Sequence, residues 1–131
     1  MQVTVTTNWL EKNLKDVIIL DASWYLPSDN RNTFIEYRSK HIPNAQFFDI
    51  DEISDKESQL PHMLPKPSLF DEQVERLGIS NDQKVIVYDT EGLFSAARAW
   101  WMFKVMGHNE VFVLDGGLPK WIAENKPLSD K

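Results

Sequence analysis

The stretch KVIVYDTEGLFSAARAWWMF, residues 84–103, joins a β-branched apolar run to a segment with helical spacing through a short loop. The run at 84–88 predicts a buried strand, because it is continuous, apolar and ends at an acidic residue. The segment from 95 to 106 predicts a helix, and Gly107 marks its end. A strand that runs directly into a helix is the repeating unit of α/β proteins, and Asp89 opens the loop between the two.

The same alternation extends outward in both directions along the chain. Apolar runs at 17–20 and 111–114 predict two more buried strands, and 45–48 predicts a weaker fourth. Helical patterns occupy 8–14, with Asn8 as the candidate N-cap, 33–40, 68–77 and 118–124. Continuous apolar strands that alternate with helices predict an α/β fold with a mostly parallel central sheet flanked by helices on both faces.

Length and composition indicate one domain and exclude several classes of function. The chain has 131 residues, which predicts a single domain over 1–131, and 42% of them are hydrophobic. A net charge of -6 without a basic patch argues against a nucleic-acid partner, and no apolar run is long enough for a membrane span. The first residues show no basic-then-apolar leader, so we expect a cytoplasmic protein with no membrane partner.

The sequence contains no cysteine. This excludes a disulfide framework, a Cys-based zinc site, a thiol nucleophile and a persulfide carrier in this chain. The segment around 49–67 differs from the rest, with three prolines, many charges and little periodicity, and predicts a long surface excursion.

Acidic residues follow the predicted strands. Asp21, Asp89 and Asp115 each stand at a strand end, and ligands of parallel sheets bind beyond the carboxyl ends of the strands. Asp89 therefore has two interpretations: a structural strand-end residue, which we favour, or a phosphoryl acceptor. The second needs an acidic pair after the first strand and a late lysine, and the sequence has neither in place.

Two other patterns bear on phosphate and metal chemistry. Asp49-Ile50-Asp51 has the Asp-x-Asp spacing of phosphatases that use a nucleophilic Asp with Mg²⁺, a spacing that is common by chance. His41, His62 and His108 are too scattered to predict a metal site, and we expect no metal and no cofactor. His62 lies in the proline-rich segment, which makes it the better functional candidate, whereas His108 at a helix end is expected to be structural.

Two motifs carry a family resemblance. Residues 37–47, YRSKHIPNAQF, are similar to the N-terminal rhodanese signature, with Asn44 where glycine is usual. Residues 113–117, VLDGG, followed by Trp121, resemble the closing strand, turn and helix of the same family. The resemblance covers nearly the whole chain and implies a rhodanese-like fold.

The match is closest to the N-terminal, non-catalytic domain of two-domain 3-mercaptopyruvate and thiosulfate sulfurtransferases. In that family a cysteine of the second domain carries the sulfur, and Asp89 occupies the corresponding loop position here. The resemblance implies that Asp51 and His62, and more loosely Arg31, support the site of the other domain. It also implies two partners, a C-terminal catalytic rhodanese domain and a small anionic sulfur donor at the cleft between the domains. On this interpretation the chain alone is inactive.

Two further functions stay open. A cysteine-free rhodanese domain can serve as a stand-alone binding or regulatory module. An exposed apolar patch discriminates the two interpretations, because a domain taken from a larger enzyme should self-associate or bind a hydrophobic dye. An Asp-based phosphatase or phosphoacceptor that uses Asp49 or Asp89 is the remote alternative.

Overall fold

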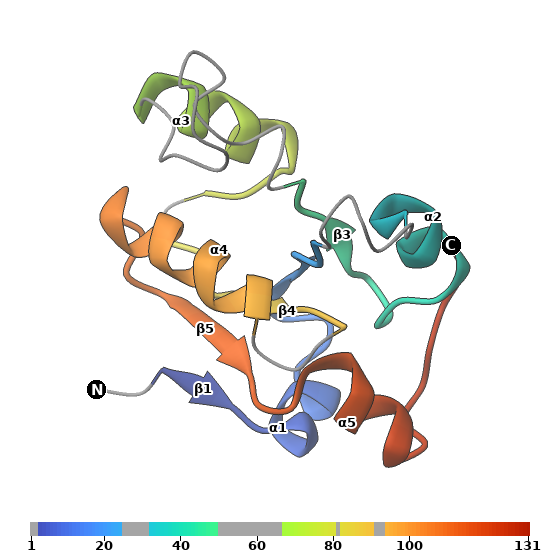
Figure 1. The fold of residues 1–131 in the computed structure, drawn as a ribbon. Helices are drawn as coiled ribbons and strands as arrows, with labels where there is room; N and C mark the ends of the chain where they lie inside the picture. The colour runs from blue at the N-terminus through green and yellow to red at the C-terminus, as the bar shows by residue number, and fades with distance from the viewer. Residues whose placement is uncertain (1–2, 25–31, 50–66, 81, 91–93) are drawn as a thin grey trace.

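The computed structural model describes residues 3–24, 32–49, 67–80, 82–90 and 94–131 (Figure 1). Five parallel strands form one sheet in the order β1-β5-β4-β2-β3. The strands are β1 (Thr4–Val5), β2 (Ile18–Asp21), β3 (Gln46–Phe47), β4 (Val85–Tyr88) and β5 (Val111–Leu114). The predicted α/β fold with a parallel sheet is confirmed.

Among the described residues, four helices connect successive strands and a fifth follows β5. They are α1 (Thr7–Lys12), α2 (Thr33–Ser39), α3 (Pro67–Arg76), α4 (Phe94–Val105) and α5 (Gly117–Ala123). Every helix predicted from periodicity is present within two residues of its expected bounds. The expected cap is wrong: the side chain of Thr6, and not Asn8, accepts the hydrogen bond from the backbone N–H of Trp9 at the start of α1.

The two faces of the sheet bury two separate sets of side chains, because successive residues of a strand point to opposite faces. On one face Val85 and Val87 of β4 pack with Phe70 of α3 and Phe103 of α4. On the other face Ile86 and Tyr88 pack with residues of α1 and α5, among them Leu10 and Trp121. Helices therefore cover both faces, as the unbroken apolar strands predict (Figure 1).

The segment after α5 is attached to the rest of the domain. The indole Nε1–H of Trp121 donates to the carbonyl of Pro127 at 2.6 Å, and His41 and Ser129 exchange two backbone hydrogen bonds of 2.9 and 2.8 Å. The ammonium of Lys126 lies 2.9 Å from the Glu11 carboxylate of α1. We call residues 125–131 the C-terminal strap. It brings the end of the chain beside α2 (Figure 1).

Candidate functional site

The carboxyl ends of β2 and β4 lie side by side at the edge where the parallel sheet is expected to hold ligands. Asp21, the last residue of β2, stands opposite Tyr88, the last residue of β4. Asp89 follows directly, and both carboxylates are almost completely buried. Asp115 follows β5 at the same edge and is exposed. The structure thus brings Asp21 and Asp89 together and leaves Asp115 apart.

Asp89 caps the N-terminus of α4. Its carboxylate accepts a 2.7 Å hydrogen bond from the backbone N–H of Ala96 and a 3.4 Å one from the Ser95 hydroxyl. These groups belong to the first turn of the helix, whose N–H groups have no partner within the helix. The carboxylate thus fills the place where a helix N-terminus would otherwise attract an anion. Because Asp89 is fully buried, it is not open to a phosphoryl donor, and the structural interpretation is the one that the geometry supports.

A buried polar chain connects the ends of β2 and β4. The Ser23 hydroxyl donates to the Asp21 carboxylate at 2.6 Å and accepts from the backbone N–H of Thr90 at 3.1 Å. The Ser23 backbone N–H donates to the same Asp21 oxygen at 2.9 Å. One serine therefore holds the loop after β4 against the loop after β2.

Burial raises the pKa values of two residues in this hydrogen-bonded group, Asp21 and its neighbour Tyr88. Desolvation raises the pKa of Asp21 above 3.8, although the hydrogen bonds from Ser23 oppose that rise, and the nearby Asp89 charge adds to it. Desolvation also raises the pKa of the neighbouring Tyr88 phenol well above 10.0, with the Asp21 charge as the next cause. The Tyr88 hydroxyl accepts a 3.3 Å hydrogen bond from the backbone N–H of Ile42, so the phenol is held in place.

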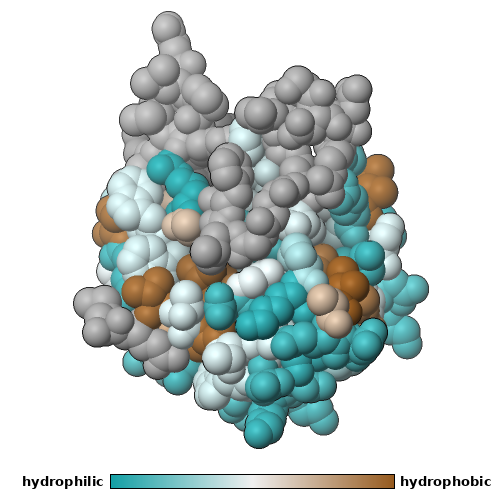
Figure 2. Space-filling model, turned by 60° about the horizontal axis from the view of Figure 1, so that its bottom comes forward, coloured by the Kyte–Doolittle hydropathy of each residue, from teal (hydrophilic) through white to brown (hydrophobic). Residues whose placement is uncertain are grey.

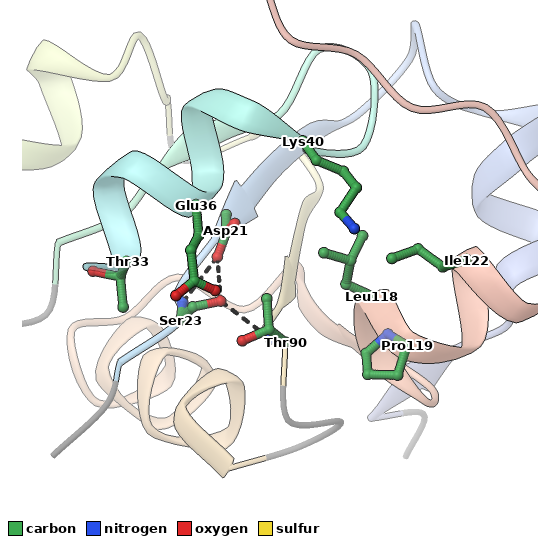
Figure 3. Close-up of a pocket in the computed structure, with 9 residues that line it drawn as sticks. All are labelled: Asp21, Ser23, Thr33, Glu36, Lys40, Thr90, Leu118, Pro119 and Ile122. Atoms are coloured by element: carbon green, nitrogen blue, oxygen red, sulfur yellow. Dashed lines mark hydrogen bonds between the residues drawn. The ribbon is translucent and has the colours of Figure 1, made fainter. Parts of the chain in front are cut away.

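A cavity of about 300 Å³ opens beside this chain (Figure 3). Its walls come from the two strand ends and from helices α2 and α5. The lining residues are Asp21, Ser23, Thr33, Glu36, Lys40, Thr90, Leu118, Pro119 and Ile122. Ser23 and Thr90 could have been found from sequence, since each lies two residues beyond a strand end. The α2 and α5 residues carry no such signal, because only the tertiary fold brings these helices to the same edge.

The other predicted site residues have different outcomes. Arg31, Asp51 and His62 lie outside the described residues, as does nearly all of the expected excursion at 49–67. Asp49 is half-buried after β3. His108 is buried and its Nε2 lies 2.8 Å from the Gln83 carbonyl, which fits the expected structural role.

Neither a metal cluster nor a membrane helix is present within the described ranges. No group of three or more His, Asp or Glu side chains is placed to hold a metal ion there. No helix among the same residues is long and apolar enough to cross a membrane.

The fold and its strand-end loops define the class of protein. The family model of the rhodanese-like domain matches residues 6–124, and the chain belongs to this family. The particular relatives are sulfurtransferases. The chain is 55% identical over 121 residues to the mitochondrial thiosulfate/3-mercaptopyruvate sulfurtransferase 1 of Arabidopsis thaliana, and 44% identical over 133 residues to the human 3-mercaptopyruvate sulfurtransferase.

Solved structures agree with these relatives. The crystal structure of the 3-mercaptopyruvate sulfotransferase SseA of Escherichia coli superposes with a TM-score of 0.93 at 41% identity, and covers 100% of this chain. The match spans 51% of that protein, 32% of the Arabidopsis relative and 45% of the human one, against 91% and 95% of this chain for the latter two. The chain thus spans a third to a half of the length of these relatives, and the resemblance to this branch of the family is confirmed.

Proposed function

We propose that this chain is the non-catalytic N-terminal rhodanese domain of a two-domain sulfurtransferase that moves sulfur from 3-mercaptopyruvate or thiosulfate to a thiophilic acceptor. Its role is to cover and shape the active cleft of a second domain that carries the catalytic cysteine. The observation that supports the proposal is that a carboxylate, and not a thiol, follows β4. The chain has no cysteine, and the Asp89 carboxylate occupies the start of α4.

The charge of this loop explains why it suits a supporting domain. A sulfur donor such as thiosulfate or mercaptopyruvate is an anion, and a helix N-terminus attracts anions. Here the buried Asp89 carboxylate already accepts from Ala96, and Asp21 adds a second acidic group nearby. Like charges repel a bound anion strongly at a buried site. This loop therefore does not receive the donor, and the proposed donor site lies on the second domain.

The experiment uses a full-length two-domain protein that begins with this chain. Asp51→Asn and His62→Ala are each expected to lower kcat/KM for 3-mercaptopyruvate, by on the order of 100-fold if the pair orients or relays a proton. Arg31→Met is expected to raise KM, since a cation at the cleft would attract the anionic donor. Asp115→Asn, exposed at a neighbouring strand end, is the matched control. Unchanged kinetics in Asp51→Asn and His62→Ala would remove the proposed support of the cleft.

The 131-residue chain alone gives a second test. We expect no sulfur transfer from either donor, because no thiol is available to form a persulfide. Measurable transfer by this chain would contradict the proposal. A cytoplasmic location stays a prediction.

A stand-alone binding module is the second candidate, and the exposed apolar residues provide the test that separates it from a domain of a larger enzyme. Phe34 and Ile35 of α2 are 47% and 61% exposed, and Trp101 and Val105 form another such pair on α4. Figure 2 shows hydrophobic side chains in separate patches among hydrophilic ones on one face of the molecule. Since a covered domain would bury such residues, self-association of the chain or binding of a hydrophobic dye fits a missing partner domain. A monomer that binds no dye favours the stand-alone module. Mg²⁺-dependent hydrolysis of a phosphate ester would instead support the remote phosphatase.

A further inference from the structure

The cavity at the strand ends combines acidic, cationic and apolar side chains that have no role in the function proposed above. It lies between α2 and α5, and Asp89 is not among its lining residues. Its volume of about 300 Å³ is at the lower end of the range typical of small-molecule sites. It also lies beyond the carboxyl ends of β2 and β4, where parallel sheets generally bind ligands.

One end of the cavity is acidic and offers hydrogen-bond acceptors. Asp21 is only 1% exposed, yet it lines the cavity, and Ser23 holds its carboxylate in a fixed orientation with two hydrogen bonds to one oxygen. The Glu36 carboxylate lies beside Ser23 on the same side (Figure 3). Thr90 completes this end with a hydroxyl group. The position of the acidic group is therefore set before any ligand arrives.

The opposite end carries a cation and an apolar wall. The side chain of Lys40 extends from α2 toward Leu118 and Ile122 of α5 (Figure 3). Lys40 follows the last residue of α2 as its C-cap, with an extended backbone (φ -163°, ψ 117°). Within the described part of the chain Lys40 makes no ion pair, and its ammonium points into the cavity. Pro119 completes the apolar wall.

We propose that this cavity binds a small zwitterionic α-amino acid with an apolar side chain. Its ammonium group would lie at the Asp21 end, its carboxylate would meet the Lys40 ammonium, and its side chain would contact Leu118 and Ile122. A simple anion meets the buried Asp21 carboxylate at one end, and a simple cation meets the repulsion of Lys40 at the other. Only a ligand with separated charges satisfies both ends, so the site is distinct from any site for the anionic sulfur donor.

The test is a titration of the 131-residue chain followed by amide chemical shifts. Three probes share the same branched apolar group: L-valine, isobutylamine, which lacks the carboxylate, and isovalerate, which lacks the ammonium. L-valine is expected to shift the amides of Lys40, Thr90 and Ile122 in a saturable manner, and to bind at least about 10-fold tighter than either single-charge probe. The amide of Asp115 is expected not to move.

Variants locate the binding. Lys40→Met should weaken the binding of L-valine by at least about 10-fold, because one charge-assisted contact is lost. The binding of isobutylamine, which has no carboxylate, should be unchanged or tighter. Lys120→Met, on α5 but outside the cavity lining, is the matched control and should bind L-valine as the wild type does. Ile122→Trp should fill the cavity and abolish binding, and this position is 37% exposed, so the fold accommodates a larger side chain.

Three results would overturn the proposal. They are the lack of a saturable shift up to the solubility of L-valine, equal affinity for L-valine and a single-charge probe, and unchanged L-valine affinity in both Lys40→Met and Ile122→Trp. None of them depends on sulfur transfer, so the proposed function and this inference fail separately.

Discussion

The Asp89 carboxylate accepts a 2.7 Å hydrogen bond from the backbone N–H of Ala96, seven residues further along the chain. The bond joins the end of β4 to the first turn of α4 and is fully buried at Asp89. The buried Asp89 side chain thus has a structural function at the start of α4.

Asp89→Ala is expected to lower the free energy of unfolding by about 1–3 kcal/mol, because it leaves buried N–H donors of the α4 N-terminus without an acceptor. Asp89→Asn keeps one acceptor oxygen and should cost less. Denaturant unfolding of the 131-residue chain measures both. The control is Asp115→Ala, since Asp115 follows β5 in the same way but is exposed, with only a 3.8 Å contact to Lys120. Equal losses for Asp89→Ala and Asp115→Ala would contradict the capping role.

Asp21 predicts a specific dependence of stability on pH. Its pKa is raised above 3.8 in the fold, chiefly by desolvation, so the folded chain holds this proton more tightly than the unfolded chain. The stability that Asp21 contributes is therefore fully present below pH 3.8 and is lost as the pH rises through the raised value. Asp21→Asn keeps an acceptor for Ser23 and removes this loss. The free energy of unfolding of the variant, relative to that of the wild type, should therefore increase as the pH rises from 3 to 7.

The matched control for that experiment is Asp82→Asn. Asp82 is exposed, and a hydrogen bond from the Ser80 hydroxyl lowers its pKa below 3.8. Its contribution is present above that pH and is lost in acid, so the control should change the pH slope in the opposite direction. A constant difference between Asp21→Asn and the wild type at every pH would show that burial of the charge is not the cause.

Local patterns predicted the elements of this fold well, and long-range contacts explain what they missed. The three apolar strands were visible because a buried strand needs no polar face. β1 was missed because two residues, Thr4 and Val5, are too short for a periodic signal, and only pairing with β5 makes them a strand. The Asn8 cap was wrong because Thr6 lies closer to the true start of α1.

The candidate site was predictable only in part for the same reason. Asp21 and Asp89 were identified as strand-end residues, and the parallel sheet did bring them to one edge. The sequence held no sign that Ser23 would link Asp21 to Thr90, because that contact spans 67 positions and depends on the order of the strands. Likewise, only the tertiary fold brings Lys40 and the α5 residues Leu118 and Ile122 to the walls of one cavity.

The C-terminal strap should depend on one indole. Trp121 is fully buried, and its Nε1–H donates to the Pro127 carbonyl at 2.6 Å. Trp121→Phe keeps an aromatic ring but removes this donor and some volume, so we expect a loss of about 2–4 kcal/mol. Trp101→Phe is the control, because Trp101 is 41% exposed and should cost at most about 1 kcal/mol. The exchange rate of the Ser129 amide, bonded to the His41 carbonyl, should rise only in Trp121→Phe.

The turn between β5 and α5 offers a test of backbone strain against side-chain contact. Gly116 and Gly78 both have positive φ, 81° and 76°, so alanine is strained at either position. A Cβ at Gly116 would lie 2.6 Å from Cβ of Lys120, whereas at Gly78 nothing lies within 4 Å. Lys120 Cβ is fixed to the helix backbone and cannot rotate away.

Gly78→Ala is therefore expected to lower the free energy of unfolding by about 1 kcal/mol, the backbone penalty alone. Gly116→Ala should cost at least twice as much, because α5 must also shift. Both are measured as free energies of unfolding, and equal costs would mean that the turn relaxes without moving α5. Since α5 supplies Leu118 and Ile122 to the cavity, the same shift should weaken the binding of L-valine in Gly116→Ala but not in Gly78→Ala.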